Sequence, residues 1–371
     1  MEALPHGGDI GAACALFPDA PEPFIDLSTG INPHSYPLPQ LALEVFRRLP
    51  EPTALASLAA IAASAYGAPS SAHVVSAPGT QILFEPVARL VRRGRAAVLG
   101  PTYAEHARAA RLAGHSVTEV RTLDALADAD LAILVNPNNP DGRLFDADTL
   151  LDLAAARRHR RGLFGVDERG EGARAGAGSG GDPNGAKNEA TCDHLLVIDE
   201  AFTDGVSDRA SLAGAVGNGD IVVLRSFGKF YGLAGLRVGF AIAEPRLTRR
   251  LAAVLGPWAV TGPAIAVASV ALADAVWAAA MRERLSVESS RLDGVLAAAG
   301  LRVIGGTPLF RLVQTPAAVG LFCHLGRAGI LVRSFAEQPA WLRFGLPGNK
   351  EDLVRLTAAL AAFAKQQHEQ P

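Results

Sequence analysis

The 371-residue sequence contains only three cysteines, Cys14, Cys192 and Cys323, which lie far apart and form no CxxC pair. This scarcity argues against a disulfide framework and against a zinc site, so we expect no metal and a reducing compartment. An excess of charge is also missing, because the formal net charge is only −2. A basic surface for nucleic acid or for an anionic membrane is therefore not expected.

The N-terminus has neither the basic start nor the apolar core of a signal peptide. No apolar run reaches the roughly 20 residues of a membrane-spanning helix without a charge or a proline. Hydrophobic residues nevertheless make up 49% of the sequence, which is enough to bury a sizeable core in two or three domains. We therefore expect a globular cytoplasmic protein.

Between about residues 73 and 243, short apolar runs alternate with segments of helical spacing. The apolar runs predict buried strands at 96–100, 131–136, 195–199, 221–225 and 238–243, with helices at 85–93, 103–113 and 147–158. Such alternation is typical of βα units and predicts an α/β fold with a mostly parallel sheet flanked by helices. Ligands in these folds bind beyond the carboxyl ends of the strands, where Asn136, Asp199 and the loop after Arg225 should meet.

The sequence outside this pattern suggests two more parts. Residues 288–371 predict a smaller α+β domain with a helix, four short strands and a closing helix. Residues 1–45 are rich in loops and are expected to contribute to the small domain and the substrate site, which leaves 46–287 as the large domain. Within it, residues 162–193 have too few apolar side chains to offset the entropy of ordering. We expect a disordered surface insertion there, away from the site.

The most informative segment runs from Ser226 to Arg237 and reads SFGKFYGLAGLR. Lys229 can form a Schiff base with an aldehyde, while Ser226 and Arg237 can hold a phosphate nearby. Pyridoxal 5′-phosphate (PLP) carries both groups, and its chemistry also needs an acidic partner for the ring nitrogen. Asp199, at the end of a predicted buried strand, supplies that carboxylate. The segment predicts a PLP site with Lys229 as the catalytic residue.

Two turns add candidate contacts to the cofactor. Gly79, Thr80 and Gln81 precede a predicted helix, and a glycine turn in that position directs backbone N–H groups at an anion such as the cofactor phosphate. Asn139 follows a predicted strand in the turn NPNNPDG and could donate to the phenolate oxygen of PLP. Each signal alone also fits an ordinary turn. Their order along the chain relative to Lys229 favours the cofactor site.

Tyr103 lies at the end of another predicted strand, in GPTYAEH. Its ring could stack on the pyridine ring of PLP, although an ordinary core tyrosine explains the position equally well. His106, three residues later, is expected on the surface of a helix rather than as an acid or base.

These residues, in this order, resemble the fold-type I PLP-dependent aminotransferase superfamily over nearly the whole chain. The flanking segments resemble its L-threonine-O-3-phosphate decarboxylases of cobalamin biosynthesis, through HGGDI at 6–10, DLSTGINP at 26–33, GPWAVTGP at 256–263 and GTPLF at 306–310. The resemblance implies a homodimer that decarboxylates L-threonine O-3-phosphate to (R)-1-amino-2-propanol O-2-phosphate. The alternative is a histidinol-phosphate-type aminotransferase, which would share every cofactor residue.

The resemblance also implies how this phosphorylated amino acid is bound. Arg343 matches the arginine that grips the α-carboxylate, and Arg333 matches the arginine that serves a substrate phosphate. Guanidinium groups suit both anions, although either arginine could instead form only a surface ion pair. His6 and Asn32 match positions that line the substrate site.

The sequence departs from the family pattern in two places. Phe202 stands where many aminotransferases have a tyrosine that bonds the PLP phenolate, so Asn139 is expected to do this alone. Residues 50–54 lack the tyrosine with which many relatives reach the cofactor phosphate of the neighbouring subunit, which leaves that contribution open. A non-catalytic binding or regulatory protein on the same scaffold is the remaining alternative. The intact Lys229, Asp199 and Asn139 argue against it.

Overall fold

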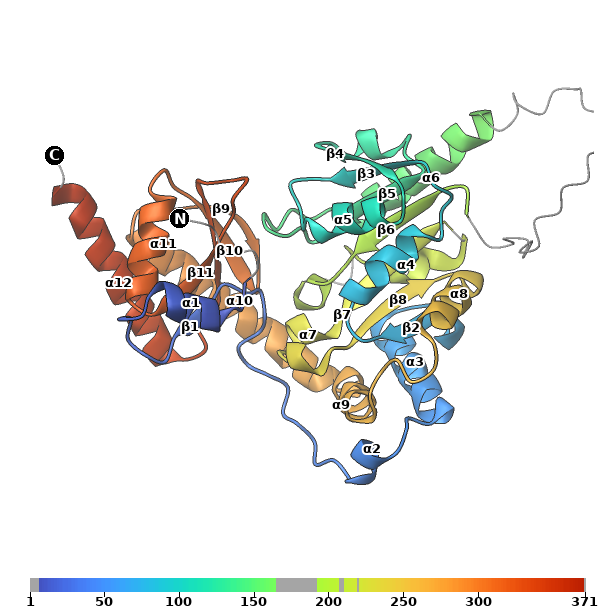
Figure 1. Ribbon diagram of the computed structural model, residues 1–371, viewed down its shortest axis with the longest axis horizontal. Coiled ribbons are helices and arrows are strands. Elements are labelled where there is room, and N and C mark those ends of the chain that lie inside the picture. The colour runs from blue at the N-terminus through green and yellow to red at the C-terminus, as the bar shows by residue number, and fades with distance from the viewer. Residues whose placement is uncertain (1–6, 165–191, 207–209, 219, 370–371) are drawn as a thin grey trace, which may run out of the picture.

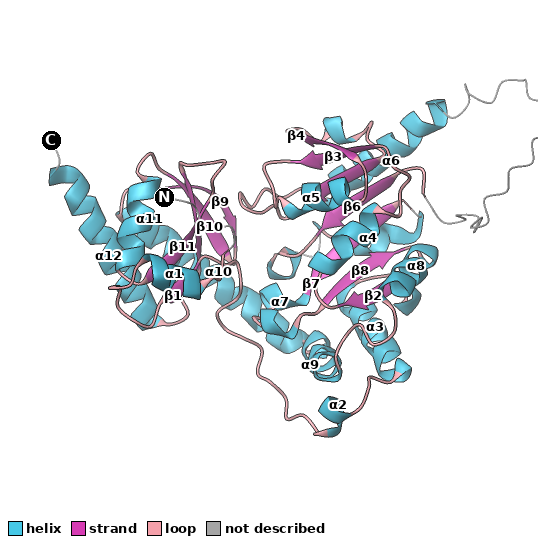
Figure 2. Cartoon of the chain, in the orientation of Figure 1, coloured by secondary structure: helices cyan, strands magenta, loops and turns pink. Residues whose placement is uncertain are grey.

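The computed structural model describes residues 7–164, 192–206, 210–218 and 220–369. The described residues form two sheets, each covered by helices, which we call the large lobe and the small lobe (Figure 1, Figure 2). His6 lies outside the described residues, and so does the segment 165–191, which makes up most of the predicted insertion.

Seven strands of the described chain form the sheet of the large lobe, in the order β2-β8-β7-β6-β5-β3-β4. They are β2 (Val74–Ala77), β3 (Arg95–Leu99), β4 (Ser116–Val120), β5 (Leu131–Val135), β6 (Leu195–Asp199), β7 (Ile221–Ser226) and β8 (Gly239–Ala243). The strands are parallel except that β8 runs antiparallel to both of its neighbours. The prediction of a mostly parallel sheet is therefore confirmed. The sequence did not reveal β4 because this edge strand, SVTEV, buries none of its side chains fully.

Helices cover both faces of this sheet. Leu196 and Ile198 of β6 belong to one buried cluster, whereas Leu195 and Val197 belong to another, as expected for a strand with both faces buried. The first face is covered by α3 (Pro52–Tyr66), α6 (Ala147–Phe164) and α9 (Gly262–Ala273), and the second by α4 (Phe84–Ala88), α5 (Glu105–Leu112) and α8 (Pro245–Leu255). The helices predicted at 85–93, 103–113 and 147–158 correspond to α4, α5 and α6.

Five strands of the described chain form the sheet of the small lobe, in the order β1-β11-β12-β10-β9. They are β1 (Ile25–Leu27), β9 (Arg302–Thr307), β10 (Phe310–Gln314), β11 (Ile330–Ser334) and β12 (Trp341–Gly345), and α1 (Ile10–Leu16), α11 (Ala318–Arg327) and α12 (Lys350–Glu369) belong to the same lobe. Strand β1 pairs with β11 in parallel and the others are antiparallel. The N-terminal segment is thus built into the small lobe through β1.

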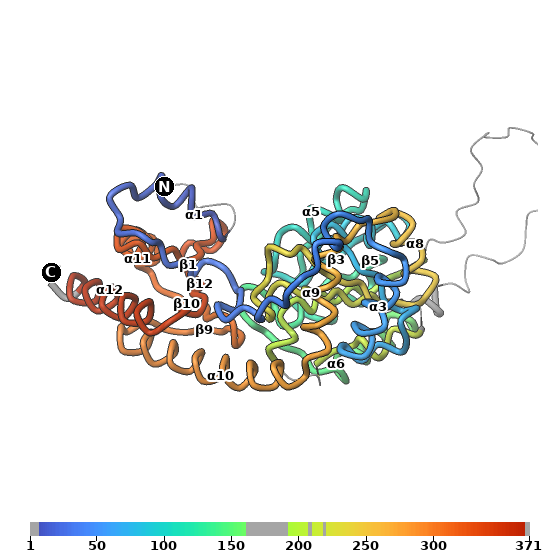
Figure 3. Tube along the Cα trace, turned by 90° about the horizontal axis from the view of Figure 1, so that it is seen from below, coloured from blue at the N-terminus to red at the C-terminus, as the bar shows by residue number. Residues whose placement is uncertain are grey.

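Helix α10 (Ala275–Ala298) runs from the large lobe into the small lobe (Figure 3). Asp274 caps its N-terminus by accepting a hydrogen bond of 2.9 Å from the backbone of Trp277. The position predicted as the boundary between the domains, 287–288, therefore falls inside a continuous helix. After β1 the chain crosses back along the molecule to α2 (Glu44–Arg47) and then enters α3 (Figure 1).

No single helix among the described residues is long and apolar enough to cross a membrane. Helices α9 and α10 reach the required length and composition only as a pair, and they are bent by 77° at their junction. The same residues contain no group of three or more His, Cys, Asp or Glu side chains that could hold a metal ion.

Candidate active site

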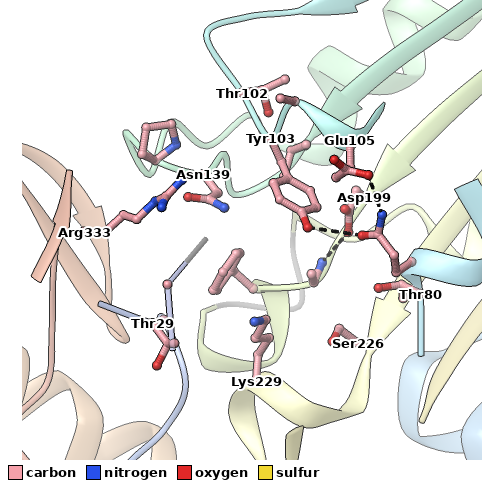
Figure 4. Close-up of a pocket in the computed structure, with 18 of the residues that line it drawn as sticks. Thr29, Thr80, Thr102, Tyr103, Glu105, Asn139, Asp199, Ser226, Lys229 and Arg333 are labelled. Carbon is pink, nitrogen blue, oxygen red and sulfur yellow. Dashed lines mark hydrogen bonds between the residues drawn. The ribbon is translucent and has the colours of Figure 1, made fainter. Parts of the chain in front are cut away.

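A cavity of about 470 Å³ opens at the carboxyl ends of the large-lobe strands, where they face the small lobe (Figure 4). Most of the predicted site residues line this cavity, namely Gly79, Thr80, Gln81, Tyr103, Asn139, Asp199, Ser226, Lys229, Arg237, Arg333 and Arg343. Gly7, next to the undescribed His6, lines it as well. Residues that are far apart in the sequence and come from both lobes therefore share one cavity.

Lys229 lies on α7 (Phe227–Phe230), a single helical turn that follows β7. Its pKa is lowered to about 8, chiefly by desolvation and further by the cations Arg343 and Arg237, while Asp199 opposes the shift. About a tenth of the amine is therefore neutral at pH 7, far more than for an ordinary lysine, and the neutral amine is the nucleophilic form. The Nζ atom lies 6.0 Å from the centre of the Phe202 ring.

Asp199, at the end of β6, is 4% exposed and accepts two hydrogen bonds. Its Oδ1 accepts from the backbone of Ala201 at 3.0 Å, and its Oδ2 lies 2.9 Å from Nε2 of His106. The prediction that His106 lies on a helix surface is wrong, because this residue is 2% exposed. It shares the buried face of α5 with Ala109 and Ala110, and that spacing of i, i+3 and i+4 is the signal that could have located it.

A cradle for an anion is formed where the Gly79 turn meets Arg237. Gly79 has φ +86°, a conformation that favours glycine, and the guanidinium of Arg237 lies directly beside it. Similarly, a Cβ at Gly239 would lie 2.5 Å from the backbone nitrogen of Thr80. Arg237 forms no ion pair with any described carboxylate, and Ser226 lines the same end of the cavity. Close backbone N–H groups beside a guanidinium suit a phosphate.

Tyr103 projects into the cavity beside Asp199 (Figure 4). Its hydroxyl donates to Oε1 of Gln81 at 3.2 Å, and Nε2 of Gln81 donates to Glu105 at 3.0 Å. Burial raises the pKa of Tyr103 above its ordinary value, so the phenol stays protonated at neutral pH. The ring is thereby fixed as a neutral, flat wall of the cavity.

The small lobe contributes two arginines, Arg333 on β11 and Arg343 on β12, which are directly paired across the two strands. Like charges in this arrangement destabilise a sheet unless an anion compensates them. Arg343 is 7% exposed, donates to Oδ1 of Asn139 and, at 2.7 Å, to the carbonyl of Ser28. Burial, and then the charge of Arg333, lower the pKa of Arg343 to about 10. Both arginines line the same cavity as Lys229, and Figure 4 shows Arg333 reaching into it from the small lobe.

Asn139, which is predicted to donate to the phenolate oxygen, and Phe202, which replaces the tyrosine of many aminotransferases, both line the cavity. Because Oδ1 of Asn139 accepts from Arg343, its Nδ2 group is left to donate. The Phe202 ring packs edge-on against Phe310 with 5.2 Å between centroids. It also fills the space over Gly30, whose Cβ would lie 2.8 Å away. Phe202 thus closes one side of the cavity with apolar surface.

Asn32 is the one described residue of the predicted site that does not line the cavity. Its side chain is 1% exposed, donates to the carbonyl of Phe230 at 2.8 Å and accepts from the backbone of His34 at 2.9 Å. Both polar groups are therefore used within the protein, behind the turn that carries Lys229. The structure thus does not bring Asn32 to the cavity, and its contact with substrate stays a prediction.

Comparisons of three kinds relate this chain to known proteins. The model of the family described as aminotransferase class I and II matches residues 38–169 and 188–360. A threonine-phosphate decarboxylase of Pseudomonas aeruginosa is 39% identical over 99% of this chain and 100% of its own, and one from a Sinorhizobium species is 39% identical over 96% and 97%. In structure, a histidinol-phosphate aminotransferase of Sinorhizobium meliloti in complex with PLP matches with a TM-score of 0.77, at 19% identity over 98% of this chain and 96% of that one.

Proposed function

The chain belongs to the aminotransferase class I and II family, and from that premise we propose that it is a PLP-dependent carboxy-lyase acting on L-threonine O-3-phosphate. The observation that carries the proposal is the cross-strand pair of Arg333 and Arg343 in the same cavity as Lys229. Two adjacent cations suit a substrate with both a carboxylate and a phosphate. The two full-length relatives that act on threonine phosphate support the same substrate.

The residues of the cavity fit PLP. The guanidinium of Arg237 lies close to Gly79, and the backbone of Thr80 lies close to Gly239. These close approaches form a tight cradle for a phosphate. The pKa of Lys229 is lowered, as the amine needs for bonding to an aldehyde carbon. The carboxylate of Asp199 is held in place by its hydrogen bond with His106. When bound, PLP supplies a ring that accepts the electron pair released when a bond to the substrate Cα breaks.

Each cavity residue then has a role in holding this cofactor. Lys229 would hold its aldehyde carbon, Asp199 its ring nitrogen and Tyr103 one face of its ring. Nδ2 of Asn139 would donate to the phenolic oxygen. The phosphate contacts fall to Gly79, Thr80, Gln81, Ser226 and Arg237, with Gln81 acting through its backbone because its side chain is bound to Tyr103 and Glu105.

The chain's own groups then direct the reaction. Arg343 would bind the substrate carboxylate and Arg333 the phosphate, and two fixed anions define the orientation of every bond to Cα. That orientation selects loss of the carboxylate over loss of the Cα proton. Nζ of Lys229, whose pKa is about 8, would deliver the proton that Cα takes up after carbon dioxide leaves. Phe202, which lines the cavity and packs on the buried Phe310, would give that side of the cavity an apolar surface that disfavours water.

The alternative function, a histidinol-phosphate-type aminotransferase, uses the same cofactor residues. The solved structure of that activity matches in fold, but at 19% identity, and so it supports the architecture alone. The alternative would require transfer of the amino group to a keto acid without release of carbon dioxide.

We also propose a cytoplasmic homodimer that supplies (R)-1-amino-2-propanol O-2-phosphate to cobalamin biosynthesis. The segment between β1 and α3 supports self-association, because four large apolar side chains there are exposed: Leu38 by 65%, Leu43 by 52%, Phe46 by 62% and Leu49 by 63%. The division into a large domain, 46–287, and a small domain, 288–371 with residues 1–45, stays a proposal, with α10 continuous across it.

The direct test mixes purified, PLP-loaded protein with L-threonine O-3-phosphate, without any keto acid, and follows carbon dioxide. We expect release by the parent protein and a loss of more than about a thousandfold in Lys229→Ala. Lys350→Ala, at the exposed start of α12, is the matched lysine control and should keep full activity. Formation of glutamate from histidinol phosphate and 2-oxoglutarate, without carbon dioxide from threonine phosphate, would establish the alternative.

A further inference from the structure

The turn that carries Lys229 is too short to satisfy its own backbone. Helix α7 has four residues, and the last four carbonyl groups of any helix have no partner within it. The relevant carbonyls are those of residues 229–232, the last two of α7 and the two that follow it; within the turn, the carbonyl of Lys229 accepts only a long bond of 3.4 Å from the backbone of Gly232. A buried carbonyl without a donor would be costly and would leave the turn poorly fixed.

All four carbonyls accept hydrogen bonds from one short segment, residues 32–36, which we call the strap. The donors are, in order, the backbone N–H of Asn32 to Lys229 at 2.9 Å, Nδ2 of Asn32 to Phe230 at 2.8 Å, the backbone N–H of Tyr36 to Tyr231 at 2.8 Å, and Oγ of Ser35 to Gly232 at 2.8 Å. The strap therefore caps the turn from outside, about 200 residues away in sequence.

The contact is close enough to require a glycine in the turn. Gly232 has φ +66°, and a Cβ atom there would lie 2.6 Å from the carbonyl oxygen of Asn32 and 2.8 Å from Cα of Ser35. Pro33 lies within the strap and Pro37 directly follows it. Prolines restrict the unfolded chain, so they reduce the entropy lost when the strap is ordered.

Helix α10 holds the strap at two points. Nε2 of His34 lies 2.6 Å from Oε2 of Glu288, whose other oxygen accepts from Arg284 at 2.9 Å. The hydroxyl of Tyr36 donates to Asp274, the N-cap of α10, at 3.1 Å. The strap continues from β1 of the small lobe, and its Tyr36 end is bonded to the start of α10 at the large lobe, so the strap is tied to both lobes.

The same helix also touches the lysine turn directly. The ring of Trp277 on α10 stacks on Tyr231 with 5.5 Å between centroids and meets the Tyr36 ring edge-on at 5.0 Å. Strap, turn and α10 thus form one packed unit. Thr29 and Gly30, just before the strap, line the cavity on the other side.

We propose that the strap is a positioning element for Lys229, fastened by the His34–Glu288 pair, and that Asn32 acts through the lysine rather than by touching substrate. This inference rests on the proposed function only in taking Lys229 as the residue that holds the cofactor. A loosened strap would let water reach the turn. Desolvation is the leading cause of the lowered pKa of Lys229, so its titration midpoint should then move upward from about 8.

The experiment measures the pH dependence of Lys229 acylation in the cofactor-free protein by mass spectrometry, and kcat and KM in the PLP-loaded protein. In Asn32→Ala we expect the midpoint to rise and kcat to fall about tenfold, with KM changed less than about twofold. Ser35→Ala removes only the bond to Gly232, so the Lys229 midpoint should rise and kcat should fall by smaller amounts than in Asn32→Ala. It also carries the test if Asn32→Ala fails to fold.

The anchor is tested by a pair of variants. Glu288→Ala should shift the Lys229 midpoint as Asn32→Ala does, whereas Glu288→Gln, which keeps an oxygen acceptor for His34, should restore it. His73→Ala is the matched histidine control, because His73 bonds only Ser70 on the surface of the large lobe. It should change neither readout.

Two results would overturn the proposal. One is a rise of KM in Asn32→Ala with an unchanged Lys229 midpoint, which would make Asn32 a substrate-binding residue. The other is an unchanged midpoint in every strap and anchor variant, which would make the strap purely structural. Lys229 acylation requires neither cofactor nor turnover, so a failure of the proposed decarboxylation leaves this measurement intact.

Discussion

The two halves of the cavity differ in the kind of interactions that surround their charged side chains. In the large lobe, Asp199 is bonded to His106, and Tyr103 is tied to Gln81. In the small lobe, Arg343 is buried beside a second cation and forms no ion pair with any described carboxylate. The large-lobe side chains beside the cofactor site are thus held by side-chain hydrogen bonds, whereas the small lobe places a buried cation directly beside a second one, an arrangement that favours an anion.

This difference assigns separate tasks to the halves. The large-lobe residues suit the cofactor, and they would serve an aminotransferase equally well. We propose that the choice of substrate and of the bond to be broken depends on Arg333 and Arg343. Changes in the small lobe should therefore alter which substrate reacts, while changes in the large lobe should weaken every reaction of the cofactor.

Among the substitutions that test the difference between the two halves, we expect Arg343→Lys to have the largest effect on activity. An ammonium group cannot replace the fork that donates to Asn139, Ser28 and a carboxylate together, and charged hydrogen bonds of this kind contribute about 1.5–3 kcal/mol each. We expect kcat/KM for threonine phosphate to fall about a hundredfold. Arg327→Lys, on the exposed end of α11, is the control and should match the parent. An Arg343→Lys variant with unchanged kinetics would remove the carboxylate role.

A smaller and more selective effect is expected from Arg333→Lys. If this residue serves the phosphate, kcat/KM for threonine phosphate should fall about tenfold or more while the low activity on unphosphorylated threonine stays the same. Steady-state kinetics with the two substrates measures that ratio. An equal loss on both substrates would show that Arg333 does not recognise phosphate.

His106→Gln tests the large-lobe half. Losing the imidazole beside Asp199 should lower kcat about tenfold and weaken PLP binding, because supporting hydrogen bonds of this kind typically contribute tenfold or more. The ratio of activities on the two substrates should not move. Fluorescence titration with PLP measures the affinity, and a changed substrate ratio would contradict the separation of tasks.

The smallest effect concerns Lys229, on which the two halves act in opposite directions. Arg343 lowers the pKa of Lys229 and Asp199 raises it, and the resulting pKa is about 8. Arg343→Met should therefore move the midpoint above 8, since removal of a cation favours the charged amine, and Asp199→Asn should move it below 8. Acylation of Lys229 against pH in the cofactor-free protein follows both. If both substitutions moved the Lys229 midpoint in the same direction, Arg343 and Asp199 would not act on it in opposite ways.

The sequence predicts the large-lobe half of the cavity better than the small-lobe half. Lys229, Asp199, Asn139 and the Gly79 turn sit in local motifs at strand ends, so their convergence follows from the α/β rule, and the five predicted strands of the large sheet are present. The pairing of Arg333 with Arg343 depends on strand register, which local patterns do not determine.

The error over His106 and the unexpected position of Asn32 have a shared physical cause. His106 and Asn32 were assigned from the residue type and from family position, but each is defined by a partner distant in sequence, Asp199 and the Lys229 turn. Local spacing could have placed His106 on the buried face of α5. Nothing local indicates that residues 32–36 supply the donors for a turn about 200 positions later.

The central claim is that Arg333 and Arg343 orient threonine phosphate for loss of its carboxylate and not of its Cα proton. Incubation of the PLP-loaded protein with L-threonine O-3-phosphate in D₂O, without a keto acid, tests this choice by NMR of the products. The account predicts 1-amino-2-propanol phosphate with a single deuterium on the carbon that lost the carboxylate. Recovered threonine phosphate carrying deuterium at Cα, without carbon dioxide, would mean that the Cα proton is removed instead and would contradict it.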